Sequence, residues 1–421
     1  MKITFYVSAF PILSETFILS QVTGLIDRGH DIQIVAQRIE NQSVTHPDVL
    51  KYKLMARTTC CGDAYANMPK NKLARAIQAF GLFFRAGVVP RSLLMRTLNV
   101  ARYGKDALTL NLFYRVFYEY RERPDTEVAF CHFGHNGESF ARVIDVGGSS
   151  AKLVTVFHGQ DLSRDLQLKH ESLYAFLFKR GHLFLPVSGH WMQTLLDMGC
   201  PKDKTSVHHM GVEPSYYAAP EPAPTALQHK NTETTLLTVA RFVEKKGLTY
   251  AIDGFSQIAE EFQSVRYCII GDGPLSEALQ QQINNLNLQE RITLVPPKNR
   301  IEIRQALADS HIFLLPSVTA SDGDMEGIPV VLMEAMASGL PVISTRHSGI
   351  PELVDSEKTG FLHEERDAQG IADSLRRLLT DQQLSDTIGK AAQEKIVSDY
   401  NLDVLNINLE KHFSSVLTDA D

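Results

Sequence analysis

The sequence predicts an α/β protein built from two doubly wound parallel sheets, one in each half of the chain. Short apolar segments alternate with helical segments along the chain. This alternation stops at the proline-rich residues 220–224 and then begins again. The 421 residues are also too many for one small core. We therefore expect one domain over residues 1–218, a second over residues 226–400, and a helix over residues 401–421 that crosses back to the first domain.

The first half begins with an apolar strand, which is expected over residues 3–9. Ser14 can cap the helix that follows, which runs to about Arg28 and stops at Gly29. The next strand, at residues 31–36, completes a βαβ unit. Two more strands, each leading into a polar loop, are expected at residues 127–131 and 153–157.

The second half repeats this pattern. Its expected strands lie at residues 235–240, 266–270, 292–295, 312–315 and 342–344. A helix begins near Pro329 and stops at Gly339, because proline favours the start of a helix and glycine the position just past its end. Since ligands bind doubly wound sheets at the carboxyl ends of the strands, functional residues are expected in the loops that follow them.

The composition indicates a soluble globular protein, with 44% apolar and 22% charged residues. The first residues run straight into a strand and lack the sections of a signal peptide. No apolar stretch is long enough to cross a bilayer. The five cysteines show neither metal-ligand spacing nor a disulfide framework. We therefore expect a cytoplasmic protein in a reducing compartment.

The net charge of −7 hides an asymmetry. Residues 1–225 hold 25 Lys and Arg against 20 Asp and Glu, a charge of +5, and the remaining 17 against 29 give −12. Residues 69–123 hold eleven basic and three acidic residues, interleaved with Phe80, Phe83 and Phe84. Two interpretations remain open: an amphipathic segment on an anionic membrane surface, or a helical insertion whose phenylalanines pack inward. The confined charge argues against a nucleic-acid partner.

Two glutamates mark the second half. Glu326 precedes the helix that begins near Pro329, and Glu334 lies inside it among apolar neighbours. A helix that is apolar all round is normally buried, so the Glu334 carboxylate needs a hydrogen-bonding partner or takes up a proton. A ligand hydroxyl or a cationic neighbour would supply that partner. The alternative is an ordinary helix-forming Glu at a solvated edge.

A basic loop and a glycine turn also follow strands of the second half. Arg241 and Lys246 lie in a loop that opens a helix, where two cations can hold a diphosphate. Lys246 could equally be a solvated charge at the start of the helix. The turn at Gly271 and Gly273 lets the backbone approach a ligand closely. Each of these signals is weak by itself.

Taken together, Arg241 with Lys246, the Gly271–Pro274 turn, and Glu326 with Glu334 resemble the retaining glycosyltransferases of family four, the glycosyl transferases group one. The resemblance covers nearly the whole chain. It implies the GT-B architecture, in which two Rossmann-like domains face a cleft. It also implies no cofactor and no essential metal, with a nucleotide diphosphate sugar as co-substrate.

The resemblance implies a role for each of these residues. Arg241 and Lys246 would hold the diphosphate of the donor and stabilise it as it leaves. Glu334 would bind the ribose hydroxyls, and Glu326 would bind hydroxyls of the transferred sugar. His158 would lie beside that sugar; the alternative is a strand-end histidine that only packs. Further donor contacts are expected from Gly271, Gly273, Gly327, Ile328 and Val330.

The first domain departs from the glycine-rich first loop of many relatives. Its loop at residues 10–17 resembles a bacterial subgroup of exopolysaccharide glycosyltransferases that includes those of colanic acid assembly. Ser14, Glu15 or Thr16 is therefore expected to touch the acceptor, although Ser14 could simply be a helix cap. His132, which ends the strand before that of His158, is a further candidate acceptor contact.

The expected function is retaining transfer of a hexose from a nucleotide diphosphate sugar to a lipid-linked oligosaccharide in exopolysaccharide biosynthesis, at the inner face of the cytoplasmic membrane. A nucleotide-sugar 2-epimerase of the same architecture, a glycosyltransferase with a small soluble acceptor, and a non-catalytic binding module are the alternatives. Asp322-Gly323-Asp324 matches the metal-binding motif of single-domain glycosyltransferases. The two-domain architecture argues against a metal there.

Overall fold

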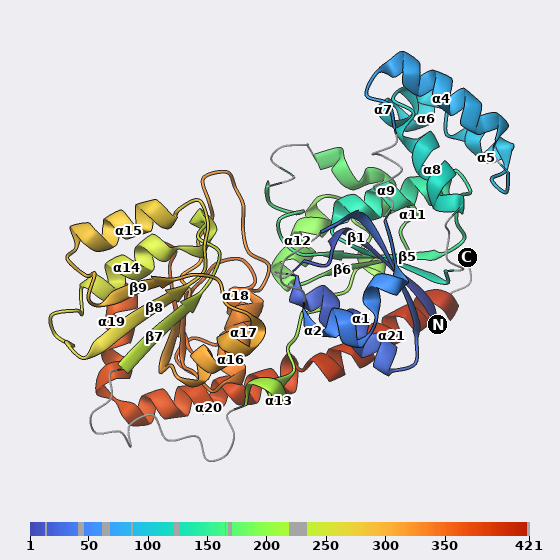
Figure 1. Ribbon diagram of the computed structural model, residues 1–421. Coiled ribbons are helices and arrows are strands. Elements are labelled where there is room, and N and C mark those ends of the chain that lie inside the picture. The colour runs from blue at the N-terminus through green and yellow to red at the C-terminus, as the bar shows by residue number, and fades with distance from the viewer. Residues whose placement is uncertain are drawn as a thin grey trace.

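The computed structural model describes residues 1–12, 15–40, 46–60, 68–85, 87–121, 126–164, 166, 171–218 and 234–418. Within them the chain forms two α/β domains, each with a six-stranded parallel sheet flanked by helices (Figure 1). The last helix, drawn in red, returns to the first domain. This is the two-domain α/β architecture that the sequence predicts.

The first sheet has the strand order β3-β2-β1-β4-β5-β6, and all neighbouring strands are parallel. Its strands are β1 (Lys2–Phe10), β2 (Asp31–Ile39), β3 (Thr58–Cys60), β4 (Val128–His132), β5 (Lys152–Phe157) and β6 (Leu183–Pro186). The central strand β4 is buried at every residue, as expected where helices cover both faces of a parallel sheet. Phe5 of β1 pairs with Ile34 on one side and with Phe130 on the other, so large apolar side chains fill the middle of the sheet.

Helices cover both faces of this sheet. They are α1 (Thr16–Asp27), α2 (Pro47–Lys51), α4 (Lys72–Phe84), α5 (Arg91–Arg96), α6 (Val100–Tyr103), α7 (Lys105–Leu108), α8 (Asn111–Arg121), α9 (Gly134–Asp145), α11 (Ala175–Arg180) and α12 (Gly189–Asp197), with the 3-10 helices η1 (Leu54–Arg57), η2 (Glu171–Tyr174) and η3 (Lys202–Lys204). Helices α4 to α8 lie between β3 and β4 in the sequence, in the region expected to be a basic insertion. They project from the first domain on the side away from the second domain (Figure 1).

The second sheet has the order β12-β11-β10-β7-β8-β9 and is also parallel. Its strands are β7 (Thr234–Val239), β8 (Val265–Ile270), β9 (Ile292–Val295), β10 (Ile312–Leu314), β11 (Val342–Thr345) and β12 (Phe361–His363). Counted from the first strand of each domain, both sheets have the order 3-2-1-4-5-6, which is that of dinucleotide-binding folds. The direction of winding therefore reverses between β1 and β4 in one sheet and between β7 and β10 in the other.

The remaining helices belong to the second domain or connect the two. They are α13 (Pro214–Tyr217), η4 (Glu244–Lys246), α14 (Leu248–Ser256), α15 (Ser276–Asn285), α16 (Arg300–Ala308), α17 (Val330–Ala337), α18 (Ile350–Leu353), α19 (Ala368–Thr380), α20 (Gln382–Asp399) and α21 (Leu402–Thr418). The expected helix near Pro329 is α17, and Gly339 follows its end with φ +80°.

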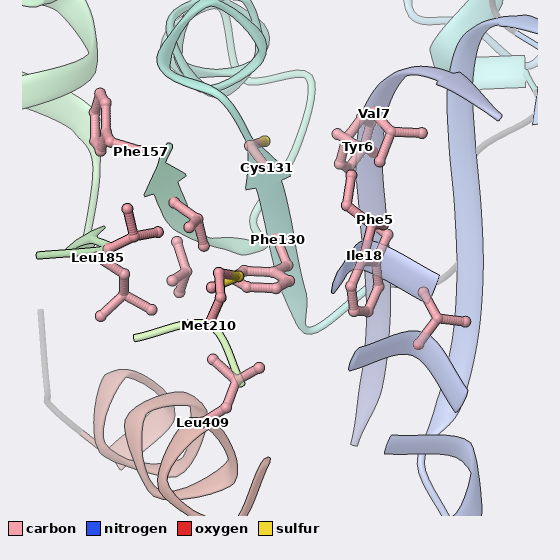
Figure 2. Close-up of a cluster of buried hydrophobic side chains, with 14 of the residues drawn as sticks. Phe5, Tyr6, Val7, Ile18, Phe130, Cys131, Phe157, Leu185, Met210 and Leu409 are labelled. Carbon is pink, nitrogen blue, oxygen red and sulfur yellow. The ribbon is translucent and has the colours of Figure 1, made fainter. Parts of the chain in front are cut away.

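The core of the first domain extends onto the last helix. Helix α21 packs against α1, where His30 Nε2 lies 2.6 Å from Glu410 Oε1. Phe413 of α21 meets Phe130 of β4 edge to face, with ring centroids 5.0 Å apart. Figure 2 shows Leu409 of α21 in the same cluster as Phe130. The last helix therefore packs with the first domain, although it follows the second in sequence.

The chain passes between the domains at two places that lie side by side. The Val212 N–H donates to the carbonyl oxygen of Tyr400 at 3.1 Å, and the Leu402 N–H donates to that of Val212 at 2.9 Å. A Cβ atom at Gly211 would lie 2.6 Å from the Tyr400 carbonyl oxygen. Only glycine therefore allows the two segments to approach this closely.

The sequence analysis missed three short strands, β3, β6 and β12. All three lie at a sheet edge and have three or four residues, too few to show a periodic pattern. The helix expected from Ser14 begins at Thr16, and Ser14 itself lies outside the described residues, as does the proline-rich segment 220–224. In the described part of the chain, no helix is long and apolar enough to cross a membrane.

Candidate active site

The candidate site lies at the point where the winding of the second sheet reverses. Residues 240–247 follow β7 and residues 315–329 follow β10, the two strands on either side of this point. Ligands of open α/β sheets bind in the crevice outside the carboxyl ends of such strands. The fold thus brings the basic loop beside the loop of Glu326, although 80 residues separate them (326 minus 246).

Two lysines of the basic loop hold the loop after β10. Lys246 Nζ lies 2.8 Å from Glu326 Oε1, and Lys245 Nζ lies 3.0 Å from Asp324 Oδ2. Burial alone would raise the pKa of Glu326, but Lys246 and Lys245 outweigh burial and lower it. The Glu326 carboxylate is therefore ionised at neutral pH, and its negative charge fixes the position of Lys246.

The same point carries groups that can bind an anion. Arg241 is exposed, and no carboxylate of the described residues pairs with it. The backbone N–H groups of Gly327, Ile328 and Val330 likewise have no acceptor within the described ranges. Unpaired N–H groups at the start of a helix carry partial positive charge and bind phosphate. Together with Lys246, these groups can contact more than one negative group of a ligand.

The backbone of Glu326 is fixed by side chains from α12 and from the loop that follows β11. Its N–H donates to His347 Nε2 at 3.0 Å, and its carbonyl oxygen accepts from Trp191 Nε1 at 3.1 Å and Ser348 Oγ at 2.7 Å. Because His347 Nε2 accepts, the ring proton is on Nδ1 and is donated to Glu365 Oε1, 2.6 Å away. The sequence analysis missed these residues, because their relation to Glu326 exists only in the folded chain.

Glu334 projects from α17 toward the segment that connects the domains. The Tyr217 hydroxyl donates to Glu334 Oε1 at 2.8 Å. Arg300 stacks on the neighbouring Tyr216, with its guanidinium carbon 4.1 Å from the ring centroid. Burial raises the pKa of Glu334, and the Tyr217 hydrogen bond and the charge of Arg300 limit that rise. The partner that this carboxylate needs is thus supplied by Tyr217 and Arg300, neither of which the sequence analysis singled out.

Gly271 and Gly273 pack against the basic loop. A Cβ atom at Gly271 would lie 1.8 Å from the carbonyl oxygen of Ala240, and one at Gly273 would lie 2.6 Å from that of Phe242. These two positions therefore need glycine so that the turn after β8 can support the loop that carries Arg241. The glycines thus allow close packing of two backbone segments. The sequence suggested a different reason, the close approach of a ligand.

Two histidines lie at the facing edge of the first sheet. His132 Nδ1 is 3.0 Å from His158 Nε2, and the rings of Phe17 and Phe133 each lie 4.7 Å from the His158 ring. Burial lowers the pKa of His158 to about 3 and lowers the pKa of His132 too, so both rings are neutral at neutral pH. His132 is fully buried behind His158. It cannot touch an acceptor there, and its place is that of a residue that orients His158.

Asp161 holds the loop that contains His158. Its carboxylate accepts hydrogen bonds of 2.8 to 3.0 Å from the backbone N–H groups of Gly134, His158 and Gly159. Burial raises the pKa of Asp161 to about 6, and these N–H donors oppose the rise. The loop after β5 is therefore fixed to the start of α9, which follows β4.

Glu15 and Thr16 lie after β1, beside the reversal point of the first sheet. Glu15 immediately precedes α1 but its side chain does not cap that helix, and Thr16 is the first helical residue. Burial raises the pKa of Glu15 to about 7, against a smaller opposing effect of Arg38. Close to neutral pH this carboxyl group is therefore present in both protonation states.

A polar network near the same point was missed from the sequence. Ser8 Oγ lies 2.8 Å from His135 Nε2. The Asn136 amide donates to Ser8 Oγ at 3.2 Å and to the carbonyl oxygen of His132 at 2.7 Å, and Gln37 donates to Asn136 Oδ1 at 2.6 Å. These side chains come from β1, β2 and α9, so no local pattern links them in the sequence. They form a polar network at the carboxyl ends of β1 and β2 and at the start of α9.

The two domains touch each other at this site. Arg164 Nε of the first domain lies 3.2 Å from Asp322 Oδ2 of the second. A Cβ atom at Gly327 would lie 2.3 Å from the carbonyl oxygen of His158, so the His158 loop and the loop of Glu326 are in direct contact. The fold thus brings His158 of the first domain next to Gly327, which follows Glu326 in the second.

Comparison with known proteins shows the family of this chain. The family model described as "Glycosyl transferases group 1" matches residues 221–395. The putative colanic acid biosynthesis glycosyltransferase WcaL of Escherichia coli (strain K12) is 38% identical over 412 residues, which are 97% of this chain and 98% of that protein. The amylovoran biosynthesis glycosyltransferase AmsK of Erwinia amylovora is 37% identical over 406 residues, which are 95% and 96% of the two chains.

Solved structures share the fold over the whole chain. Anabaena Alr3699/HepE, in complex with UDP and glucose, has a TM-score of 0.71 at 15% identity and covers 99% of this chain and 100% of its own. Sucrose-phosphate synthase from Thermosynechococcus elongatus has a TM-score of 0.71 at 15% identity, with 100% of both chains covered. At this identity the likeness concerns the fold alone, which is the two-domain GT-B fold.

Proposed function

We propose, on the premise that this chain belongs to the glycosyl transferases group 1 family and is a glycosyltransferase, that it moves a hexose from a nucleotide diphosphate sugar to a lipid-linked oligosaccharide in exopolysaccharide biosynthesis. The premise rests on 38% identity over nearly the full length of a relative. The donor class, the acceptor class and retention at the anomeric carbon are the proposed parts.

One observation carries the donor assignment. Arg241, Lys246 and the unpaired N–H groups at the start of α17 meet where the second sheet reverses its winding. This arrangement suits a diphosphate, because it offers cations and N–H donors to several phosphate oxygens at once. Glu334 lies in the same helix, with no described donor on its second carboxylate oxygen, and can accept from ribose hydroxyls. The solved relative that binds UDP and glucose has the same fold, which agrees with this assignment.

Retention follows from transfer on one face of the sugar. The bond between the anomeric carbon and the diphosphate oxygen breaks, the acceptor oxygen bonds to that carbon on the same face, and the acceptor proton passes to the departing phosphate. Arg241 and Lys246 stabilise the negative charge that develops on the diphosphate. Glu326, held by Lys246 and by its fixed backbone, binds sugar hydroxyls, and neutral His158 donates or accepts a hydrogen bond at the sugar's other side.

The acceptor assignment rests on the relatives and on the first domain. WcaL, a putative colanic acid biosynthesis glycosyltransferase, is 38% identical to this chain, and AmsK, an amylovoran biosynthesis glycosyltransferase, is 37% identical. Glu15 and the network of Ser8, Gln37 and Asn136 offer hydroxyl-binding groups on the first-domain side. An oligosaccharide carried on a lipid would place the enzyme at the inner face of the cytoplasmic membrane.

Incubation with a panel of labelled nucleotide sugars tests the proposal. With extracted membrane lipids as acceptor, we expect label to move into the lipid-linked fraction from one class of donor. The anomeric configuration of the new bond, read by NMR, should match that of the donor. Transfer to water-soluble sugars alone would favour a small soluble acceptor, and an epimerised nucleotide sugar formed without acceptor would favour the epimerase alternative.

A further inference from the structure

The outer face of α4 exposes a row of large apolar side chains. Leu73, Ile77, Phe80 and Phe84 are 71%, 65%, 67% and 56% exposed, and Val88, which follows the helix, is 73% exposed. Their spacing within α4, at positions i, i+4, i+7 and i+11, places the first four on one face of the helix. The rings of Phe80 and Phe84 also contact each other, with centroids 4.7 Å apart. These five exposed apolar side chains are called the α4 outer face here.

The opposite face of α4 is already occupied. Ala79 is buried, and the Tyr114 hydroxyl of α8 donates to the carbonyl oxygen of Arg75 at 2.9 Å and lies 2.8 Å from Gln78 Oε1. These contacts fix the rotation of α4 on α8, so the helix cannot turn its apolar row inward. The sequence left open whether this segment packs into the domain or lies on a membrane. Packing into the domain describes only the face of α4 that contacts α8. The other face has nothing covering it among the described residues.

The surroundings of the α4 outer face are basic. The exposed cations beside it are Lys70, Lys72, Arg85 and Arg91. No carboxylate of the described residues forms an ion pair with any of them. The two acidic residues of the insertion that the structure describes turn to other partners, since Asp106 pairs with Arg142 and Glu119 with Arg115. The apolar row is thus bordered by unneutralised positive charge.

We propose that the α4 outer face docks on an anionic membrane surface, with its five apolar side chains among the acyl chains and its four cations at the lipid headgroups. Apolar area and cations on one helix are the two terms that bind a helix to an anionic interface. A symmetric contact between two copies would instead set like charges opposite each other. The insertion points away from the acidic second domain, which can therefore remain in the aqueous phase (Figure 1).

This inference deepens the proposed function, because it places the enzyme where a lipid-linked acceptor is found. Co-sedimentation of the full chain with vesicles tests it directly, and it needs neither donor nor acceptor. We expect binding to vesicles that contain phosphatidylglycerol, weaker binding as salt rises, and little binding to pure phosphatidylcholine. The triple variant Ile77→Ser, Phe80→Ser, Phe84→Ser should bind at least about tenfold less. The triple variant Lys72→Glu, Arg85→Glu, Arg91→Glu should lose about as much on anionic vesicles alone.

A matched control removes exposed apolar side chains elsewhere. Ile301 and Val397 of the second domain are 68% and 50% exposed, so the variant Ile301→Ser with Val397→Ser should bind like the wild type. Circular dichroism and UDP binding should be unchanged in every variant, which shows that loss of vesicle binding is not loss of folding. Failure of the wild type to bind vesicles would overturn the inference. A dimer in analytical ultracentrifugation that the apolar variant abolishes would also overturn it and assign the face to a second copy.

The outcomes of the two experiments separate the two proposals. Vesicle binding without sugar transfer from any donor would leave the docking surface in place and refute the proposed function. Sugar transfer to a detergent-solubilised acceptor by a protein that does not bind vesicles would support the proposed function and refute the docking surface.

Discussion

Arg241 and Lys246 carry the same charge in different surroundings. Arg241 is exposed, whereas Lys246 neutralises Glu326, a residue that is only 7% exposed. Removing Lys246 leaves a buried carboxylate without its cation, which is costly, while removing Arg241 leaves no buried group unpaired. The two residues therefore allow the effect on chemistry to be separated from the effect on stability.

Alanine at either position is expected to lower kcat by about 10²–10³-fold, and more than it weakens donor binding, because both cations act on charge that develops on the leaving diphosphate. Only Lys246→Ala should also lower the free energy of unfolding, by about 3 kcal/mol. Steady-state kinetics and urea unfolding of both variants measure this. Wild-type turnover from both would remove the diphosphate assignment.

Glu334 offers a test of ribose recognition. The change Glu334→Gln keeps the hydrogen bond from Tyr217 but removes the charge, so nucleotide diphosphate binding should weaken about tenfold or more, as for hydrogen bonds to charged groups. A 2′,3′-dideoxy nucleotide should bind the variant and the wild type equally in calorimetry. The variant Tyr217→Phe is the control, because it removes only the protein partner. If Glu334→Gln binds the ordinary nucleotide as tightly as the wild type does, Glu334 is a structural residue.

Glu15 predicts a pH dependence of stability. Its pKa in the folded protein is about 7, raised by burial from 4.5. Between these values the folded protein holds a proton that the unfolded chain has lost, so stability falls as pH rises through this window and levels off above it. Relative to Glu15→Gln, the wild type should lose up to about 3 kcal/mol between roughly pH 4 and pH 8. Urea unfolding across this range measures the loss, and parallel stability curves would contradict it.

Among the elements, α21 lies farthest from its neighbours in sequence. It follows the second domain in sequence but buries Leu409 and Phe413 against the first. The sequence predicts both a helix here and its return to the first domain. The contacts that define the return, such as that of Phe413 with Phe130, join positions 283 residues apart (413 minus 130) and have no local signal.

The variant Phe413→Ala should lower the free energy of unfolding by about 3–5 kcal/mol, because it leaves a cavity beside Phe130. Val404 on the same helix is 43% exposed, so Val404→Ala should change the free energy by less than about 0.5 kcal/mol. Thermal unfolding followed by calorimetry compares the two. Equal effects would mean that α21 is not part of the first-domain core.

The strands show which elements a sequence pattern can predict. The longer strands, such as β1 and β8, were predicted to within one residue at each end because most of their residues are apolar and buried. The edge strands β3, β6 and β12 were missed because three or four residues do not establish a period. Strands β9, β10 and β11 are as short, but they could be predicted because they continue the regular alternation of strands and helices in the second half.

At the scale of the whole molecule, the site residues also fall into those that the sequence could predict and those that it could not. Arg241, Lys246, Glu326 and Glu334 could be predicted because each stands in a local pattern of loop and helix. The residues that hold these side chains in place could not be predicted. They reach the site only where the two domains, or loops distant in sequence, come into contact: Tyr217, Arg300, Trp191, His347 and Glu365. His132 was predicted as a ligand contact from its strand end alone. Its complete burial is a property of the folded sheet and of Phe5 and Phe130, whose rings pack on it.

The contact of Gly211 with residues 400–402 has a mechanical consequence. Because the two interdomain segments are hydrogen-bonded to each other, they tie the domains together at this place, which can serve as a pivot. Rotation about this pivot would separate the His158 loop from Gly327 while both sheets stay intact, which is how a bulky sugar nucleotide would enter. We expect Gly211→Val, whose side chain would force the segments apart, to broaden the distance between spin labels at His190 and Lys358 in pulsed EPR. A wild-type distance distribution in that variant would place the pivot elsewhere.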